Sequence, residues 1–187
     1  MTQPAYSAPV PSDDAELRRL ALIGRLATRF SHQIGNAVGV IATTADLVKR
    51  APTTESVDAI VTSAADATAL CIALRELLRV EGGPAIVDVN AVVTRTAEAL
   101  DRLFAPRIRV SAELDSTCAE VRVDAGELRR AIADLVLRTE THMTEEGAVR
   151  IHTLARGDRV TIVVIASHAE EGNELAIEDG VVRPPAM

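Results

Sequence analysis

The sequence predicts an α+β fold in which an N-terminal helical hairpin is followed by a small α/β sandwich. Three observations lead to this prediction. Apolar residues return at heptad spacing through residues 17–48, and again at helical spacing through residues 57–78. After Gly82-Gly83-Pro84 the pattern changes to helix, strand, strand, helix, strand, strand. That order is typical of one sheet that carries helices on one of its faces.

The first part of the chain predicts a loose tail and two long helices. Residues 1–12 contain three prolines and are expected to be flexible. Ser12, followed by acidic residues, is a suitable cap for a helix that runs to about Arg50, where Ala51-Pro52 ends it. A second helix from Glu55 to about Glu81 returns antiparallel and completes a unit of residues 13–82. Two helices cannot cover each other's broad apolar faces, so we expect a homodimer through residues 13–81 that forms a four-helix bundle.

The second part, residues 85–170, predicts the α/β unit. Asp88 or Asn90 caps a helix that ends before Pro106, residues 107–114 alternate as a strand, and residues 120–123 form a short strand. An amphipathic helix covers residues 125–143. Strands at 149–151 and 160–165 follow, joined by a hairpin turn at Gly157-Asp158. Residues 171–187 are expected to be a poorly ordered tail with at most one edge strand.

Composition excludes several classes of function. The 187 residues carry a formal charge of −7 and only 2% aromatic residues, which argues against nucleic acid as a partner. No uninterrupted apolar run approaches the roughly 20 residues that span a bilayer, and the first residues lack a signal-peptide pattern, so we expect a cytoplasmic protein without a membrane anchor. Cys71 and Cys118 have no metal-ligand spacing and are expected to be reduced packing residues.

His32 is the most informative residue of the first helix. It lies off both apolar rows, so the imidazole should point to solvent. Gly35 and Gly39 lie beside it, although each costs about 1 kcal/mol relative to alanine in a helix. A partner that approaches closely and brings a phosphoryl group explains this bare strip. A solvated histidine beside helix-packing glycines explains it too.

The segments Gly24–Ala27 and His32–Val40 resemble the phosphoacceptor box of bacterial sensor histidine kinases, and His32 matches the phosphorylated histidine. Residues 87–90, 107–110 and 123–128 resemble the start of the ATP-binding domain of that family. The resemblance covers about residues 15–167. It implies a dimerisation and phosphoacceptor hairpin followed by an ATP-binding fold.

Three departures from the family pattern separate this chain from a working kinase. Gln33 stands where the family has an acid that accepts the proton of the histidine. Arg138 stands where the family has the asparagine that binds magnesium, and a positively charged side chain there repels the metal ion. Ala166–Glu170 replaces the Asp-x-Gly-x-Gly loop that reads adenine. The chain therefore resembles the dimeric histidine phosphotransferases of phosphorelays, which keep the hairpin and a degenerate ATP-binding-like domain.

This resemblance implies a phosphotransfer protein with a phosphohistidine intermediate, without ATP and without a cofactor of its own. Magnesium is expected only in the partner, a response-regulator receiver domain; a hybrid histidine kinase is a further candidate partner. His32 is the expected nucleophile, with Asn36 and Gln33 beside it in the catalytic set. The expected partner-binding residues share this region of the helix: Arg25, Thr28, Arg29, Gly35, Gly39 and Thr43.

Two other hypotheses remain at this point. A non-catalytic, pseudokinase-like dimer that docks and regulates a kinase or a response regulator needs the same surface. A working kinase predicts measurable ATP binding. His142, His152 and His168 have no metal spacing and are expected at the surface or at a helix end.

Overall fold

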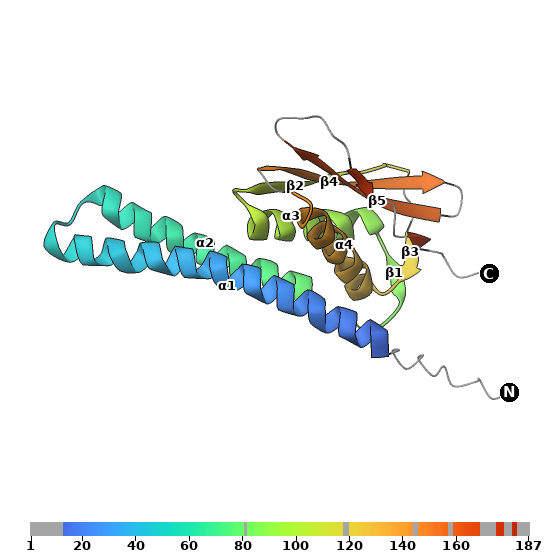
Figure 1. Ribbon diagram of the computed structural model, residues 1–187, viewed down its shortest axis with the longest axis horizontal. Helices are drawn as coiled ribbons and strands as arrows, with labels where there is room; N and C mark the ends of the chain where they lie inside the picture. Colours follow the sequence, from blue (N-terminus) through green and yellow to red (C-terminus); the bar gives the residue numbers. More distant parts are fainter. Residues whose placement is uncertain are drawn as a thin grey trace.

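The computed structural model describes residues 13–80, 82–117, 120–143, 146–156, 159–168, 175–177 and 181–182. The expected cap Ser12, the expected turn Gly157-Asp158, Cys118 and the side chain of His168 lie outside this set. The architecture is α+β, as the sequence predicts, and has three layers (Figure 1). A sheet lies on one side of two short helices, and the long helical hairpin lies on their other side.

The hairpin consists of α1 (Asp13–Arg50) and α2 (Thr54–Leu78). Pro52 follows the end of α1, and Thr53 caps α2, its hydroxyl accepting the Ser56 amide at 3.1 Å. Helix α2 ends at Leu78 rather than near Glu81, because Arg79 already has extended backbone with φ −60° and ψ 126°. The prediction that Gly82-Gly83 stops this helix was therefore wrong.

Two aspartates begin the shorter helices. Asp88 caps α3 (Val89–Phe104) by accepting the Ala91 amide at 3.1 Å, and Asp124 caps α4 (Ala125–Glu140) by accepting the Glu127 amide at 2.9 Å. Of the two caps proposed for the third helix, Asp88 is the one used. Asn90 instead donates to the Asp115 carbonyl at 2.9 Å.

The main sheet has the strand order β2-β4-β5-β6, and β7 also pairs with β5. Strands β2 (Ile108–Glu113) and β4 (Gly147–Arg156) are parallel, whereas β5 (Arg159–His168) is antiparallel to β4. Strands β4 and β5 are longer than predicted, because their ladder of ten residue pairs extends beyond the apolar segments from which the strands were predicted.

Two features of the sheets differ from the prediction. A separate two-stranded antiparallel sheet joins β1 (Ala85–Val87) to β3 (Val121–Val123), so there are two sheets and not one. In the C-terminal tail, both β6 (Leu175–Ile177) and β7 (Val181–Val182) pair with β5, where at most one edge strand was expected. The pairing of β1 with β3 and the pairing of β6 and β7 with β5 join very short segments, some of them far apart in the sequence. Hydrophobic periodicity does not reveal pairings of this kind.

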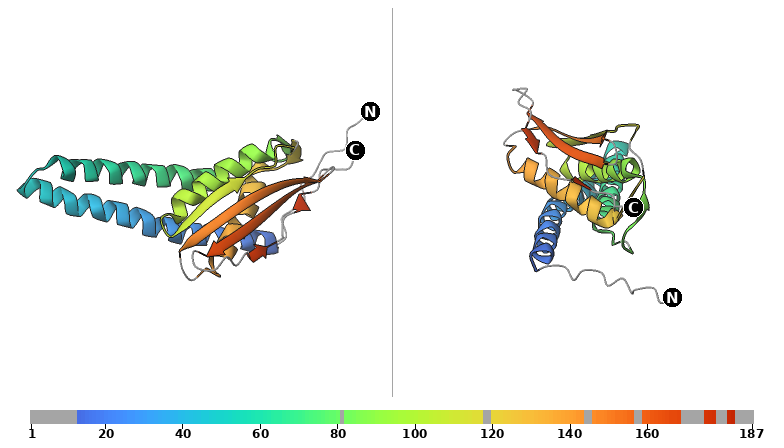
Figure 2. Two further views of the ribbon diagram at one scale, coloured as in Figure 1. Left: turned by 90° about the horizontal axis from the view of Figure 1, so that it is seen from above. Right: turned by 90° about the vertical axis from the view of Figure 1, so that its right-hand side faces the viewer.

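Buried apolar residues of all three layers form one core cluster. Leu22 and Leu26 of α1 and Leu70, Ala73 and Leu77 of α2 join the same buried cluster as the inward residues of α3, α4 and the sheet. Beyond this contact the loop end of the hairpin extends away from the rest of the molecule (Figures 1 and 2).

Helix α2 is unusually apolar for its exposure. Its length and a mean hydropathy of 1.6 over an 18-residue window satisfy the requirements for a membrane span by composition, yet the helix packs along α1 and against α3. Only 11% of that window is buried within the chain. The large apolar side chains left exposed on the hairpin are Leu17, Leu20, Val38, Val40, Leu47, Val57, Val61 and Ile72.

Candidate functional site

His32 lies exposed on α1, as its position off the apolar rows predicts. Two threonines of the predicted partner surface turn their hydroxyls back onto the helix. Thr28 donates to the Gly24 carbonyl at 2.9 Å, and Thr43 donates to the Gly39 carbonyl. These side chains therefore present mainly their methyl groups to a partner.

The glycines of this helix have free space around them. A Cβ atom added at Gly24, Gly35 or Gly39 would meet no atom of the chain within 4 Å. None of the three is therefore needed for packing within this chain, although each weakens the helix. Of the two explanations that the sequence offers, packing of these glycines against another element is not seen within the described part of the chain.

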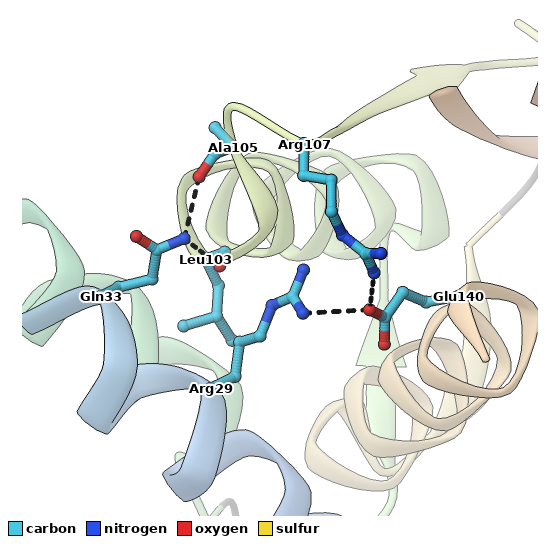
Figure 3. Close-up of polar contacts among 6 residues, drawn as sticks. All are labelled: Arg29, Gln33, Leu103, Ala105, Arg107 and Glu140. Atoms are coloured by element: carbon cyan, nitrogen blue, oxygen red, sulfur yellow. Dashed lines mark hydrogen bonds and ion pairs between the residues drawn. The ribbon is translucent and has the colours of Figure 1, made fainter. Parts of the chain in front are cut away.

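Arg29, one turn before His32, is directed toward the α/β unit (Figure 3). Its guanidinium donates to the Glu140 carboxylate at 2.9 Å, and the same Glu140 oxygen is held by Arg107. Arg29 also stacks on Phe104, with its guanidinium carbon 4.3 Å from the ring centroid. Glu140 and Arg29 are only 15% and 22% exposed, so this contact is largely shielded from water.

Arg25 makes the second charged contact between α1 and α4. It pairs with Asp134, whose other oxygen lies 3.4 Å from Nε of Arg138. Arg25 and Asp134 remain more than one third exposed, so this pair is more accessible to water and salt than the contact of Arg29.

Gln33 and Asn36 lie in different surroundings. The Gln33 amide donates to the Ala105 carbonyl at 2.9 Å and also lies 3.4 Å from the Leu103 carbonyl, both at the end of α3 (Figure 3). Asn36 is exposed and lies one turn beyond His32. The structure thus places His32 and Asn36 at the surface, and Gln33 in the contact between the hairpin and the α/β unit.

His32 lies at the edge of a groove between α1 and the last turn of α4. The groove has a volume of about 450 Å³, and Arg29, His32, Leu137, Glu140 and Thr141 contribute to its walls. Asn36 instead lines a second hollow of about 480 Å³, between the hairpin and the end of α3, together with Gln33, Asp66 and Pro106. The predicted site is therefore divided between two neighbouring depressions.

The face of α4 that corresponds to the magnesium-binding position of the kinase family is used for other contacts. Arg138 is exposed, and Asp134 is paired with two arginines. A positive side chain and a carboxylate already held by cations do not suit a magnesium–nucleotide complex. Ala166, at the start of the replaced adenine loop, is 1% exposed and belongs to the core.

Two other histidines lie within the described part of the chain with described side chains. His142 is exposed just beyond α4, whereas His152 on β4 is half-buried, with Nδ1 3.4 Å from a Glu113 carboxylate oxygen. Within the described ranges, no three His, Cys, Asp or Glu side chains come together in a way that could hold a metal ion.

Glu140, Arg107 and Asp134 are not among the residues predicted for the site. One signal for Glu140 was present: a carboxylate in the last turn of a helix opposes the helix dipole and calls for a nearby cation. The cations come from α1 and from the segment before β2, and the contact of Arg29 spans 111 residues of sequence.

Comparisons with known proteins agree with this architecture. No protein-family model and no curated protein matches the chain. A solved structure described as a bacterial phosphotransferase is similar with a TM-score of 0.54 and 17% identity, over 86% of this chain and 72% of that one. At this identity the likeness shows the fold alone, and this chain has the fold of that phosphotransferase.

Two histidine kinases show weaker similarity. One is ThkA, solved in complex with the response regulator protein TrrA, with a TM-score of 0.41, 18% identity, and coverage of 83% of this chain and 48% of that one. The other is AdeS of Acinetobacter baumannii, with a TM-score of 0.36, 16% identity, and coverage of 73% and 72%.

Proposed function

We propose that the protein is a histidine phosphotransferase of two-component signalling, in which His32 receives a phosphoryl group from one receiver aspartate and passes it to another. The observation that carries this proposal is the exposed His32 on a helix face where Gly24, Gly35 and Gly39 leave room for a close partner. The likeness to a phosphotransferase fold supports it.

The proposed phosphoryl transfer requires few catalytic groups from this chain besides the imidazole of His32. A neutral imidazole attacks the phosphorus atom through one ring nitrogen; a P–N bond forms while the P–O bond to the aspartyl carboxylate breaks, and the carboxylate leaves. The acyl phosphate is already activated, and the receiver domain supplies magnesium and a lysine. Asn36 would contact the incoming partner beyond His32.

The surroundings of His32 favour transfer between proteins over attack on ATP. Gln33 offers no carboxylate to accept a proton, and its amide is engaged with the Ala105 carbonyl at 2.9 Å. On α4, Arg138 and the doubly paired Asp134 do not suit magnesium. We therefore propose that the protein has no nucleotide cofactor.

Phosphoryl transfer tests the proposal directly. Purified receiver domains, phosphorylated with labelled acetyl phosphate, are mixed with the protein, and label on the protein is followed over time. We expect label on the wild type and none on His32→Ala, with Asn36→Ala slower but still labelled. Lys49→Ala, at an exposed position of the same helix, serves as the control and should be labelled like the wild type.

Other outcomes would favour the competing functions. If no receiver labels the wild type but His32→Ala still binds a receiver, the protein is a docking regulator. Binding of ATP in a calorimetric titration, followed by label on His32 from ATP, would indicate a kinase.

We also propose that the hairpin pairs with a second copy of the chain. Eight large apolar side chains of α1 and α2 remain exposed, among them Val61 at 62% and Ile72 at 58%. A second hairpin would cover them in a four-helix bundle. Sedimentation equilibrium should show a dimer for the wild type and a folded monomer for Val61→Glu; a wild-type monomer would contradict this.

A further inference from the structure

We propose that the α/β unit is locked onto α1 in one orientation by two carboxylates of α4, Asp134 and Glu140, which arginines of α1 hold. The lock fixes one wall of the groove beside His32. This inference stands apart from the proposed phosphotransfer, because it concerns a shape that can be measured without any phosphoryl group.

The shared apolar core holds the α/β unit on α1 but does little to fix the orientation of one on the other. Leu22 and Leu26 of α1 are 3% and 0% exposed, and they lie in one cluster with the core of the α/β unit. Apolar burial is non-directional and depends mainly on the area removed from water. Small rotations of one part on the other would change this area little.

The polar contacts fix the orientation of the α/β unit on α1. Arg25, Arg29 and Gln33 follow one another along α1 at one-turn intervals, and they reach three different places: Asp134 within α4, Glu140 at its end, and the Ala105 carbonyl after α3. Charge-assisted hydrogen bonds depend strongly on geometry. The contacts of Arg25 and Arg29 are of this kind, and the neutral hydrogen bond of Gln33 adds a third point of attachment. Contacts at three separate points resist both rotation about α1 and tilting away from it.

The contact at Glu140 is built more firmly than an ordinary surface ion pair. Arg29 approaches Glu140 from α1, and Arg107 approaches the same oxygen from the segment before β2 (Figure 3). Phe104 supports the Arg29 guanidinium, whose carbon lies 4.3 Å from the ring centroid. A second anchor joins α4 to α2, where Arg129, 2% exposed, lies 3.0 Å from Glu76. Helix α4 is thus held to both helices of the hairpin.

The same residues shape the surface around His32. Arg25, Arg29 and Glu140 line the groove that contains His32, with Leu137 and Thr141 of α4 opposite α1. Fixing α4 therefore fixes the width of the groove. A partner that reaches the imidazole from this side meets a rigid wall, and no movement of the α/β unit is needed to expose His32.

Pulsed electron paramagnetic resonance can test the orientation. Spin labels are placed at Ala42 of α1 and Arg122 of β3, both exposed, in a Cys71→Ser/Cys118→Ser background. Labelled chains are diluted with unlabelled chains, so that only distances within one chain contribute. We expect one narrow distance distribution, which Arg25→Ala/Arg29→Ala widens to roughly twice its width because directional contacts are lost.

Two further variants keep the result unambiguous. Lys49→Ala, which removes an exposed ion pair within α1, should leave the distribution unchanged. Glu140→Gln keeps the side-chain size and should also broaden the distribution; it decides the outcome if circular dichroism shows that the double variant is unfolded. A broad or two-peaked distribution without the arginine substitutions, or an unchanged one in both Glu140→Gln and a folded double variant, would overturn the inference.

Discussion

Two neighbouring sides of helix α1 differ in what covers them. On one side Leu22, Leu26, Arg29 and Gln33 are engaged by the α/β unit of the same chain. On the other, exposed His32 is followed by Gly35 and Gly39, and the described part of the chain leaves open space where a Cβ atom of either would lie. Arg25, Arg29 and Glu140 line the groove beside His32, and all three are already paired within the molecule.

The largest loss of stability is expected from a substitution in the apolar contact between α1 and the α/β unit. Leu26→Ala removes a side chain that is 0% exposed and leaves a cavity between α1 and the α/β unit, so the free energy of unfolding should fall by about 2–5 kcal/mol. Urea denaturation at fixed protein concentration measures it. Leu114→Ala, at a position 42% exposed and outside the hairpin, is the matched control. An equal loss in both variants would show that Leu26 is not part of a shared core.

A smaller loss is expected at the charged part of the same side. Arg29→Ala removes a shielded charge-assisted hydrogen bond and a stacked guanidinium, and we expect a loss of about 1–3 kcal/mol. Lys49→Ala breaks a pair that is 76% and 70% exposed and should change stability by less than about 0.5 kcal/mol. Similar losses for the two variants in urea denaturation would mean that the contact of Arg29 is no stronger than a surface pair.

On the exposed side of α1, near His32, a substitution should raise the stability instead of lowering it. Gly35→Ala fills empty space and restores helix propensity, so stability should rise by about 0.5–1 kcal/mol while binding of a receiver weakens. Gly147→Ala is the contrasting substitution, because its Cβ would lie 2.6 Å from the Ser167 carbonyl oxygen and should destabilise the protein. Denaturation and receiver titrations test both. Tighter receiver binding by Gly35→Ala would contradict a close approach at this face.

The smallest effect is expected far from α1, at Asp115. Hydrogen bonds from the Thr117 hydroxyl and from the Ala155 and Thr117 amides lower the pKa of this carboxyl below its usual 3.8. The ionised form therefore stabilises the folded state above about pH 4, and this contribution is lost as the pH falls through the lowered pKa. Asp115→Asn should slightly lower Tm at pH 6, and the difference from wild type should shrink as the pH falls below 3.8 and through the lowered pKa. A difference that stays constant with pH would show that charge is not involved.

Local rules predicted much of the fold from the sequence. Pro52 and Asp88 mark helix ends, as predicted, because proline geometry and capping depend on adjacent residues. Strand β1 was missed, since three residues are too few to show alternation and their partner strand lies far along the chain. The same limit applies to the extra edge strands, which only pairing with β5 reveals.

The candidate site was predictable in its exposed part only. The position of His32 off the apolar rows follows from helical periodicity, and the structure confirms its exposure. Arg25 and Arg29 were expected to face a partner, and their roles there remain a prediction, but in this chain both reach acids more than 100 residues away. Such pairing depends on the packing of α4 against α1, which no spacing within α1 encodes.

The core shared by the hairpin and the α/β unit also bears on how the chain is made. Leu22 and Leu26 leave the ribosome long before α4, since Arg25 precedes its partner Asp134 by 109 residues. During most of synthesis the apolar stripe of α1 can be covered only by α2 or by a chaperone. The nascent hairpin completes its structure only when the second half of the protein has been translated, so a ribosome that stalls before α4 would hold an exposed, aggregation-prone helix.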